Sequence, residues 1–229
     1  MTLNTQTPDP AAAVRRLAFY GGSFDPLHNG HFAISKALVR QFRLQEFVFV
    51  PAFHAPHKLG RTPTSAFHRF AMLALATADD PALSVSTMEL EMPERPYTVE
   101  TLGRLLKKLK PMDIFFVMGA DSWADICTWH EWERVLTMTN HIVVTRPGYS
   151  VDAHHVTENI RERIVDLRGE SAQNVRVSGI ETKIYISDAV ISNTSASRIR
   201  TRIKERSAGW RNDMPEVVAN YVEKYELYT

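Results

Sequence analysis

One stretch of the chain decides its fold: Leu17-Ala18-Phe19-Tyr20-Gly21-Gly22-Ser23-Phe24-Asp25-Pro26-Leu27-His28-Asn29-Gly30-His31. It begins with a short apolar run that is ended by two glycines, which predicts a buried strand. Apolar residues then recur three or four positions apart, at Ile34, Ala37, Leu38 and Phe42, as on one face of a helix. The stretch therefore predicts a strand, a polar loop and a helix, in that order.

The same alternation continues along the chain. Further strand-like apolar runs occupy residues 47–50, 83–87, 114–118, 142–144 and 183–187. Helical spacing recurs around residues 67–74, 102–109, 160–167 and 195–207, and Thr98 is the expected cap of the second of these helices. Nearly continuous apolar strands are typical of parallel sheets that are covered on both faces. The sequence thus predicts a single α/β domain, a doubly wound Rossmann-like parallel sheet with helices on both faces.

Composition limits the classes of function. The 27 basic and 26 acidic residues give a net charge of +1, which offers no field for nucleic-acid or membrane binding. Cys127 is the one cysteine, so an internal disulfide is excluded and a cytoplasmic location is expected. Residues 1–14 are polar and rich in proline and alanine, which predicts a disordered tail before a domain at residues 15–229. The sequence leaves a homo-oligomer open.

The polar loop carries the residue types that bind phosphate. Gly21 and Gly22 allow a ligand close to the backbone through unusual backbone angles, and Ser23 adds a hydroxyl. His28 and His31 stand at the expected start of the helix, where unpaired N–H groups favour an anion. Such a set suits transfer chemistry at a triphosphate. The competing interpretation, a turn with two metal-binding histidines, lacks a third ligand, so no metal site is expected.

The string GGSFDPxHxGH is similar to the signature of the HxGH nucleotidylyltransferases, in the form found in bacterial nicotinate-nucleotide adenylyltransferases. The resemblance covers roughly residues 15 to 205. It implies that His28 and His31 bind the phosphates of ATP and stabilise the transition state. It also implies that Gly21, Gly22, Ser23 and Phe24 line the ATP site.

A second segment, 191–200, resembles the ISxTxxR motif of that family in two registers. Ile191 to Thr194 fits the first half of the motif, but Arg198 then comes one residue late. Aligning Ser195, Ser197 and Arg200 fits the arginine spacing and the helix that follows, and we prefer this register. The competing interpretation is a plain capped helix with an exposed arginine. The preferred register assigns these three residues to ATP, with Arg200 on its phosphates.

The remaining matches divide between the two substrates of the family. Lys58 would contact a phosphate of ATP or the departing pyrophosphate, and Gly119 and Asp121 would lie on the ATP side. Thr98, Trp129 and Arg146 would bind the acceptor, with Trp129 stacking on its pyridine ring. The charged run at residues 158–168 matches nothing and predicts a solvated helix face.

The resemblance implies an enzyme of NAD biosynthesis. It would transfer AMP from ATP to nicotinate mononucleotide, giving deamido-NAD and pyrophosphate, with Mg²⁺ bridging oxygens of ATP. Two alternatives remain. One is another enzyme of the superfamily, such as a phosphopantetheine adenylyltransferase or a cytidylyltransferase. The other is a nucleotide-binding regulator without catalysis.

Overall fold

The computed structural model describes residues 14–53, 63–91, 97–109, 112–145, 151–169, 175, 181–188, 190 and 194–229. The expected tail lies outside these residues except for Val14, and so do Lys58 and Arg146. Among the described residues, no helix combines the length and the apolar character needed to cross a bilayer.

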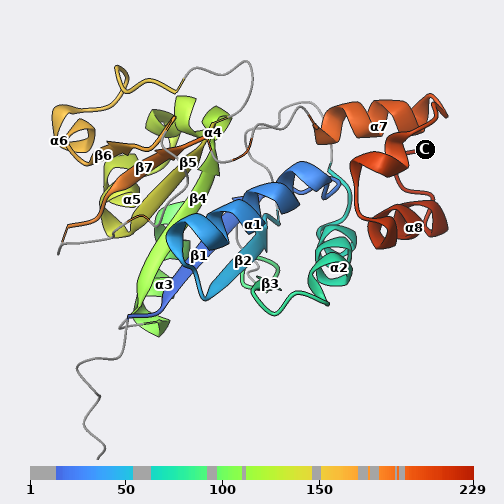
Figure 1. Ribbon diagram of the computed structural model, residues 1–229, viewed down its shortest axis with the longest axis horizontal. Helices are drawn as coiled ribbons and strands as arrows, with labels where there is room; N and C mark the ends of the chain where they lie inside the picture. The colour runs from blue at the N-terminus through green and yellow to red at the C-terminus, as the bar shows by residue number, and fades with distance from the viewer. Residues whose placement is uncertain are drawn as a thin grey trace, which may run out of the picture.

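The described residues form a seven-stranded sheet in the order β3-β2-β1-β4-β5-β7-β6, and Figure 1 shows it with α1 in front of the strands. Every neighbouring pair is parallel. The strands are β1 Arg16–Gly22, β2 Glu46–Pro51, β3 Leu83–Val85, β4 Asp113–Gly119, β5 Asn140–Val144, β6 Ile164–Asp166 and β7 Ile184–Ser187. The predicted parallel sheet is confirmed.

The helices divide between the two faces of the sheet. They are α1 Asn29–Phe42, α2 Ala66–Thr77, α3 Thr98–Lys108, α4 Ala120–Ala124, α5 Trp132–Met138, α6 Glu158–Arg161, α7 Ala196–Lys204 and α8 Glu216–Lys224, with short 3₁₀ helices at Ile126–Thr128 and Trp210–Asp213. One core lies under α1, α2, α7 and α8, and takes Ala18 and Tyr20 from β1. The other lies under α3 to α6, and takes Leu17 and Phe19. Alternate side chains of a strand therefore enter opposite cores, as a doubly wound fold requires.

The strand order reverses between β1 and β4, which lie side by side at the centre of the sheet. Their carboxyl ends, Gly22 and Gly119, open onto the same edge. In open α/β sheets this switch point is where ligands bind. The polar loop after β1 therefore lies at the switch point, where the sequence predicts that a ligand binds.

The helix expected at residues 160–167 is wrong. The helix ends at Arg161, and Ile164–Asp166 instead forms β6, which pairs with β7. Ile164 packs against one core, whereas Val165 packs against the other. This alternation suits a strand, and it prevails over the helical spacing because both faces of the sheet edge are covered.

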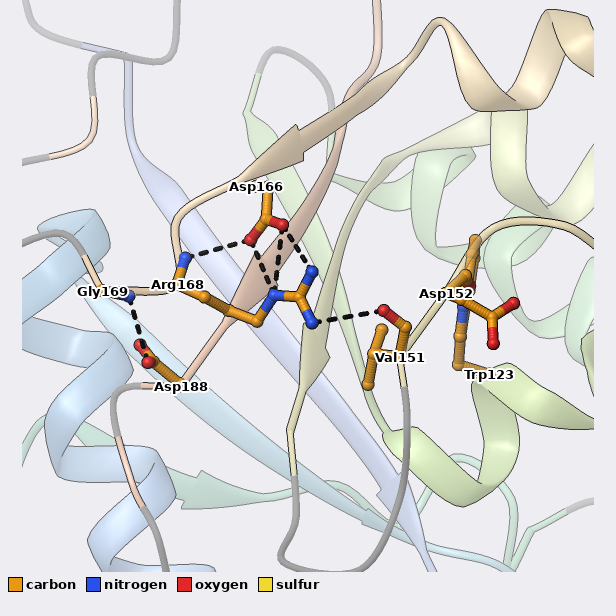
Figure 2. A network of polar contacts seen from close by, with 7 residues as sticks. All are labelled: Trp123, Val151, Asp152, Asp166, Arg168, Gly169 and Asp188. Carbon is orange, nitrogen blue, oxygen red and sulfur yellow. Dashed lines mark hydrogen bonds and ion pairs between the residues drawn. The ribbon is translucent and has the colours of Figure 1, made fainter.

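The prediction of a solvated helix face therefore holds only for the first part of the charged run, where Glu158 and Arg161 are exposed on α6, and is wrong for residues 164–168. The Asp166 carboxylate accepts bonds from the backbone N–H and the guanidinium of Arg168. Arg168 Nη1 also donates to the carbonyl of Val151 at 3.3 Å, and the N–H of Gly169 reaches Asp188 at 3.1 Å. Figure 2 shows these contacts joining the turn after β6 to the segment at Val151. The end of the charged run therefore connects the turn after β6 to the segments at Val151 and Asp188, beside the edge strands β6 and β7.

Arg69, on α2, holds the loops at the carboxyl edge of β1 and β2. Arg69 is only 1% exposed, and its guanidinium donates to four backbone carbonyls. Nη1 reaches Ser23 at 2.7 Å, and Nη2 reaches Ala52 at 2.7 Å and Phe53 at 3.3 Å. Nε reaches Thr64 at 2.9 Å. One buried side chain thus joins the loop after β1, the loop after β2 and the approach to α2.

His141, in β5, is a fully buried imidazole. Its Nδ1 donates to the carbonyl of Thr139 at 3.0 Å, since a carbonyl can only accept. Burial lowers the pKa of His141 from 6.5 to about 4, against a smaller opposing effect of that hydrogen bond. The ring is therefore neutral in the folded protein over the physiological range.

We expect Arg69→Lys to lower the free energy of unfolding by about 3 kcal/mol, because one ammonium cannot replace a fork that serves four carbonyls. Chemical denaturation measures this loss. Arg134→Lys is the matched control, since Arg134 makes an exposed ion pair with Glu131 and its replacement should cost less than about 0.5 kcal/mol. Equal losses in the two variants would contradict the role of Arg69.

His141 should make stability fall on acidification. Its pKa is lowered on folding, so its contribution is complete above pH 6.5 and is lost as the pH falls towards 4. Compared with His141→Leu, the wild type should lose roughly 2 kcal/mol of unfolding free energy between pH 7 and pH 5. Denaturation curves of both proteins at the two pH values measure the difference, and a gap that does not change with pH would refute it.

Candidate active site

The loop between β1 and α1 carries the two histidines of the signature. His28 is the N-cap of α1 and is buried, and His31 lies in the first turn of that helix. Their rings stack with centroids 3.7 Å apart and planes 23° apart. The backbone N–H of His28 donates to Nδ1 of His31 at 3.3 Å. In a neutral His31 ring the proton therefore sits on Nε2, which makes Nε2 a hydrogen-bond donor.

The glycines act here by leaving space and not by unusual backbone angles. Neither Gly21 nor Gly22 has a positive φ, whereas Phe24 does, at 45°. A Cβ on Gly22 would lie 2.9 Å from the Phe24 ring. Phe24 itself is 2% exposed and packs edge-on against Tyr20 and Phe49. Its side chain therefore belongs to the core, and the loop turns above it.

Asp25 joins this loop to distant parts of the chain and is 4% exposed. Its carboxylate accepts from the hydroxyl of Tyr228 at 2.8 Å and from the N–H of Thr64 at 3.4 Å. Its backbone carbonyl accepts from Nη1 of Arg200 at 2.6 Å. Asp25 is thus a junction between the signature loop, α7 and the segment after α8.

The start of α7 faces the signature loop. Ser195 is the N-cap, and its hydroxyl accepts from the N–H of Arg198 at 3.3 Å and lies 3.3 Å from the hydroxyl of Ser197. Arg198 is exposed, whereas Arg200 contacts Asp25. The geometry therefore agrees with the register that aligns Ser195, Ser197 and Arg200. It does not place Arg198 against the loop.

A hollow of about 330 Å³ lies beside Arg200. Its lining residues share polar or cationic groups, and they are Ser197, Arg200, Thr201, Lys204, Tyr228 and Thr229. Two cations one helical turn apart give it a positive side. The hollow can therefore accept an anionic group that is also in reach of Arg200.

The end of β4 forms the other side of the switch point. Gly119 is the N-cap of α4, and the exposed Asp121 lies in the first turn of that helix. A Cβ on Gly119 would lie 2.5 Å from Oδ1 of Asp121, so a larger residue here would require this exposed carboxylate to turn away. Because β4 pairs with β1, Gly119 and Asp121 lie at the same edge of the sheet as the loop after β1.

The predicted acceptor residues gather on the other layer. Thr98 is the first residue of α3, but Tyr97 is its N-cap, so the expected cap is wrong. The Glu100 carboxylate accepts from the N–H of Tyr97 at 3.1 Å, and this longer side chain takes the capping role. The Tyr97 ring lies 4.3 Å from that of His130, the neighbour of Trp129. Thr98 and Trp129 therefore come from segments that touch.

Trp129 is half-buried with its edge towards Phe116 of β4, their centroids 6.5 Å apart. This contact fixes the indole beside the central strands. Of the three residues assigned to the acceptor, the structure thus brings Thr98 and Trp129 into one neighbourhood. The third, Arg146, lies outside the described residues.

Sequence reasoning missed Arg69, Tyr228 and Glu89. Burial raises the pKa of Glu89 to about 7, with smaller opposing effects of the Phe53 backbone and the Arg69 charge. Arg69 did leave a signal, because it is the one arginine in the mostly apolar segment 66–77. Tyr228 left none, since nothing in its neighbourhood along the chain points to Asp25.

Comparison with known proteins places the chain in a family. Residues 19–202 match the model of the cytidylyltransferase-like family. A protein of Thermoanaerobacter sp. (strain X514) named "Probable nicotinate-nucleotide adenylyltransferase" is 34% identical, over 93% of this chain and 94% of the relative. A protein of the same name from Mycolicibacterium vanbaalenii is 33% identical, over 93% and 92%.

The fold also matches solved structures. A nicotinic acid mononucleotide adenylyltransferase of Plasmodium falciparum, complexed with NaAD, superimposes with a TM-score of 0.69 at 18% identity, over 93% of this chain and 97% of that one. At this identity the likeness concerns the fold alone. From the family match and the two relatives together, the chain belongs to the cytidylyltransferase-like family and, within it, to the nicotinate-nucleotide adenylyltransferases.

Proposed function

We propose that this protein transfers the adenylyl group of ATP to nicotinate mononucleotide, giving deamido-NAD and pyrophosphate. The observation that carries the proposal is that Arg200 of α7 contacts the loop at the switch point of the sheet that leads into the stacked rings of His28 and His31. The relatives named above support the choice of substrates.

The reaction needs no covalent intermediate with the protein. The phosphate oxygen of the acceptor attacks the α-phosphorus of ATP, and the bond from that phosphorus to the bridging oxygen of the β-phosphate breaks. The electron pair of that bond leaves with pyrophosphate. Negative charge grows on the leaving group and on the oxygens of the α-phosphorus, so fixed N–H donors and cations lower the barrier.

The residues of α1 and its loop are assigned to the reacting phosphates. Nε2–H of His31 is the donor for a phosphate oxygen, because the His28 backbone occupies Nδ1. The backbone of Gly21, Gly22 and Ser23 lies at the same edge, where a strand end and a helix start favour an anion. The histidines therefore stabilise charge at the α-phosphorus.

The residues of α7 are assigned to the outer phosphates and the departing pyrophosphate. Ser195 and Ser197 supply hydroxyls at the start of this nine-residue helix, and Arg200 supplies a guanidinium beside the hollow. We assign Lys58 to the same phosphates, and Gly119 and Asp121 to the nucleoside side of ATP. The starts of α1 and α7, which face each other, would thus both contribute groups that compensate the charge of the phosphates.

The acceptor is assigned to the layer of α3. Trp129 offers a ring for stacking on the pyridine, and the N–H groups at the start of α3, at Thr98, suit a carboxylate. Arg146 is assigned to the same acceptor as a charge partner. This placement sets the acceptor against the opposite layer from Arg200, with the reacting phosphates between them.

Mg²⁺ is proposed to arrive with ATP. Among the described residues, no three His, Cys, Asp or Glu side chains gather as a ligand set. The metal would therefore bind oxygens of the triphosphate and water, and supply charge neutralisation there. The protein's own cations hold the remaining phosphate charge.

Purified protein with ATP and Mg²⁺ should release pyrophosphate with nicotinate mononucleotide, because the acceptor segment fits a pyridine carboxylate. Nicotinamide mononucleotide and phosphopantetheine are offered in parallel, and CTP replaces ATP in a further reaction. Release with phosphopantetheine alone, or with CTP alone, would refute these substrates and indicate another enzyme of the superfamily. Binding of ATP without any release would indicate a regulator.

We expect His31→Ala to lower kcat by about 10²- to 10³-fold, since a fixed donor to the transition state is lost. The thermal midpoint should stay close to that of the wild type. The matched control is His154→Ala, an exposed histidine far along the chain from the signature, which should leave kcat unchanged. Turnover near the wild-type value in His31→Ala would remove the catalytic role of this ring.

A further inference from the structure

The start of α1 is bonded to a distant segment of the chain. Asn29 is the first residue of α1, comes between the two signature histidines and is exposed. Its side chain donates from Nδ2 to the backbone carbonyl of Asn212 at 2.8 Å, across 183 residues of chain. Asn212 belongs to the short 3₁₀ helix Trp210–Asp213, which comes between α7 and α8. The helix that carries His31 is therefore connected to the segment after α7.

Arg202, on α7, fixes this 3₁₀ helix. Its Nη2 donates to the carbonyl of Ala208 at 2.7 Å, before the 3₁₀ helix begins, and its Nη1 pairs with Oδ2 of Asp213 at 2.7 Å, where the 3₁₀ helix ends. Gly209 has a φ of 85°, and a Cβ there would lie 2.8 Å from Nη2 of Arg202. Glycine thus permits both the left-handed turn and the close approach of the guanidinium. One arginine thereby holds both ends of the 3₁₀ helix against α7.

Two connections therefore join α7 to the region of the signature histidines. One is direct, from Nη1 of Arg200 to the carbonyl of Asp25 at 2.6 Å, and comes before the histidines in the chain. The other passes through the 3₁₀ helix to Asn29 and comes between them. Because Asn29 lies in the first turn of α1, the second connection restrains the helix itself and not only the loop before it.

We propose that Asn29 is a positioning residue for ATP: its bond to the 3₁₀ helix holds the start of α1, with His31, at a fixed distance from Arg200 of α7. The inference rests on the proposed function, which assigns His31 and Arg200 to the phosphates. A misplacement of about 1 Å between groups that act on one substrate can cost about 10²-fold in rate. The effect should fall on ATP and leave the acceptor unchanged, because Thr98 starts α3 and Trp129 packs against the other core.

Asn29→Ala removes the bond at no cost in helix propensity, since alanine is the best helix former. The KM for ATP, and the Kd for ATP with Mg²⁺ measured by calorimetry, should both rise by about tenfold, at the upper end for loss of one hydrogen bond. The KM for nicotinate mononucleotide and the thermal midpoint should stay close to the wild-type values. A lower midpoint with an unchanged Kd for ATP, or equal rises in both KM values, would indicate a merely structural bond and overturn the proposal.

Gln45→Ala is the matched control. Gln45 is also an exposed amide side chain, and it accepts from the backbone N–H of Arg16 at 2.6 Å and donates to the carbonyl of Arg43 at 3.0 Å. These bonds lie where β1 begins, at the opposite end of the strand from the signature loop. ATP affinity should be unchanged in this variant, and an equal loss in both variants would refute a specific role for Asn29.

Arg202→Gln and Asp213→Ala break one ion pair from its two sides. Each loosens the 3₁₀ helix from α7, so each should weaken ATP binding as Asn29→Ala does. An effect of charge alone would have opposite signs, because the first variant removes a positive charge and the second removes a negative one. Unchanged or tighter binding of ATP by Asp213→Ala would therefore overturn the part assigned to the 3₁₀ helix.

The combination of Asn29→Ala with Asp213→Ala tests whether the two side chains act through one connection. The doubly substituted protein should bind ATP within about threefold of the weaker single variant, because the second substitution cuts a connection that is already broken. Losses that multiply to about a hundredfold would show independent effects and overturn the proposal. Because calorimetry needs no turnover, a wild type that binds ATP but makes no product would contradict the proposed function, while the Kd values would still decide this inference.

Discussion

The site depends on one buried cation, the guanidinium of Arg69. Removing a charge from water is costly, and burial accordingly lowers the pKa of Arg69, with the nearby Asp25 charge opposing this shift. The cost is offset by carbonyls of three separate segments, each within 3.3 Å of a guanidinium nitrogen. Since those segments end β1, end β2 and begin α2, the loops that carry Ser23 and the signature histidines have one shared support.

The sheet could be predicted from the sequence because its strands are nearly continuous apolar runs, such as the one at β4. Predictions failed where two patterns compete over a short length. Residues 160–167 satisfy helical spacing as well as alternation, and only the covered edge beside β7 decides for the strand. At the start of α3, Thr98 has a side chain suited to an N-cap. The N-cap is nevertheless Tyr97, whose backbone N–H donates to the Glu100 carboxylate.

Part of the candidate site was predictable for a different reason. His28 and His31 are neighbours along the chain, and the start of α1 alone brings their rings together. Arg200 followed from a resemblance, and its contact with Asp25 agrees with the register chosen. Tyr228 left no signal in the sequence, and Arg69 stood out only as an arginine in a mostly apolar helix, because the partners of both residues are fixed by tertiary packing. With chain separations of 46 residues from Arg69 to Ser23 and 203 residues from Tyr228 to Asp25, the local pattern does not show which partners these side chains have.

The long chain separations at Asp25 also bear on the order of folding. Its bonds to Arg200 and Tyr228 close loops of 175 and 203 residues, which are among the least local contacts that a chain of this length can make. Contacts of this kind form after local helices and adjacent strands, because their closure entropy must be met first. We therefore expect the candidate site around Asp25 to be among the last regions of the chain to become ordered. If the proposed function is correct, nucleotide binding should accordingly be gained only after the sheet has assembled.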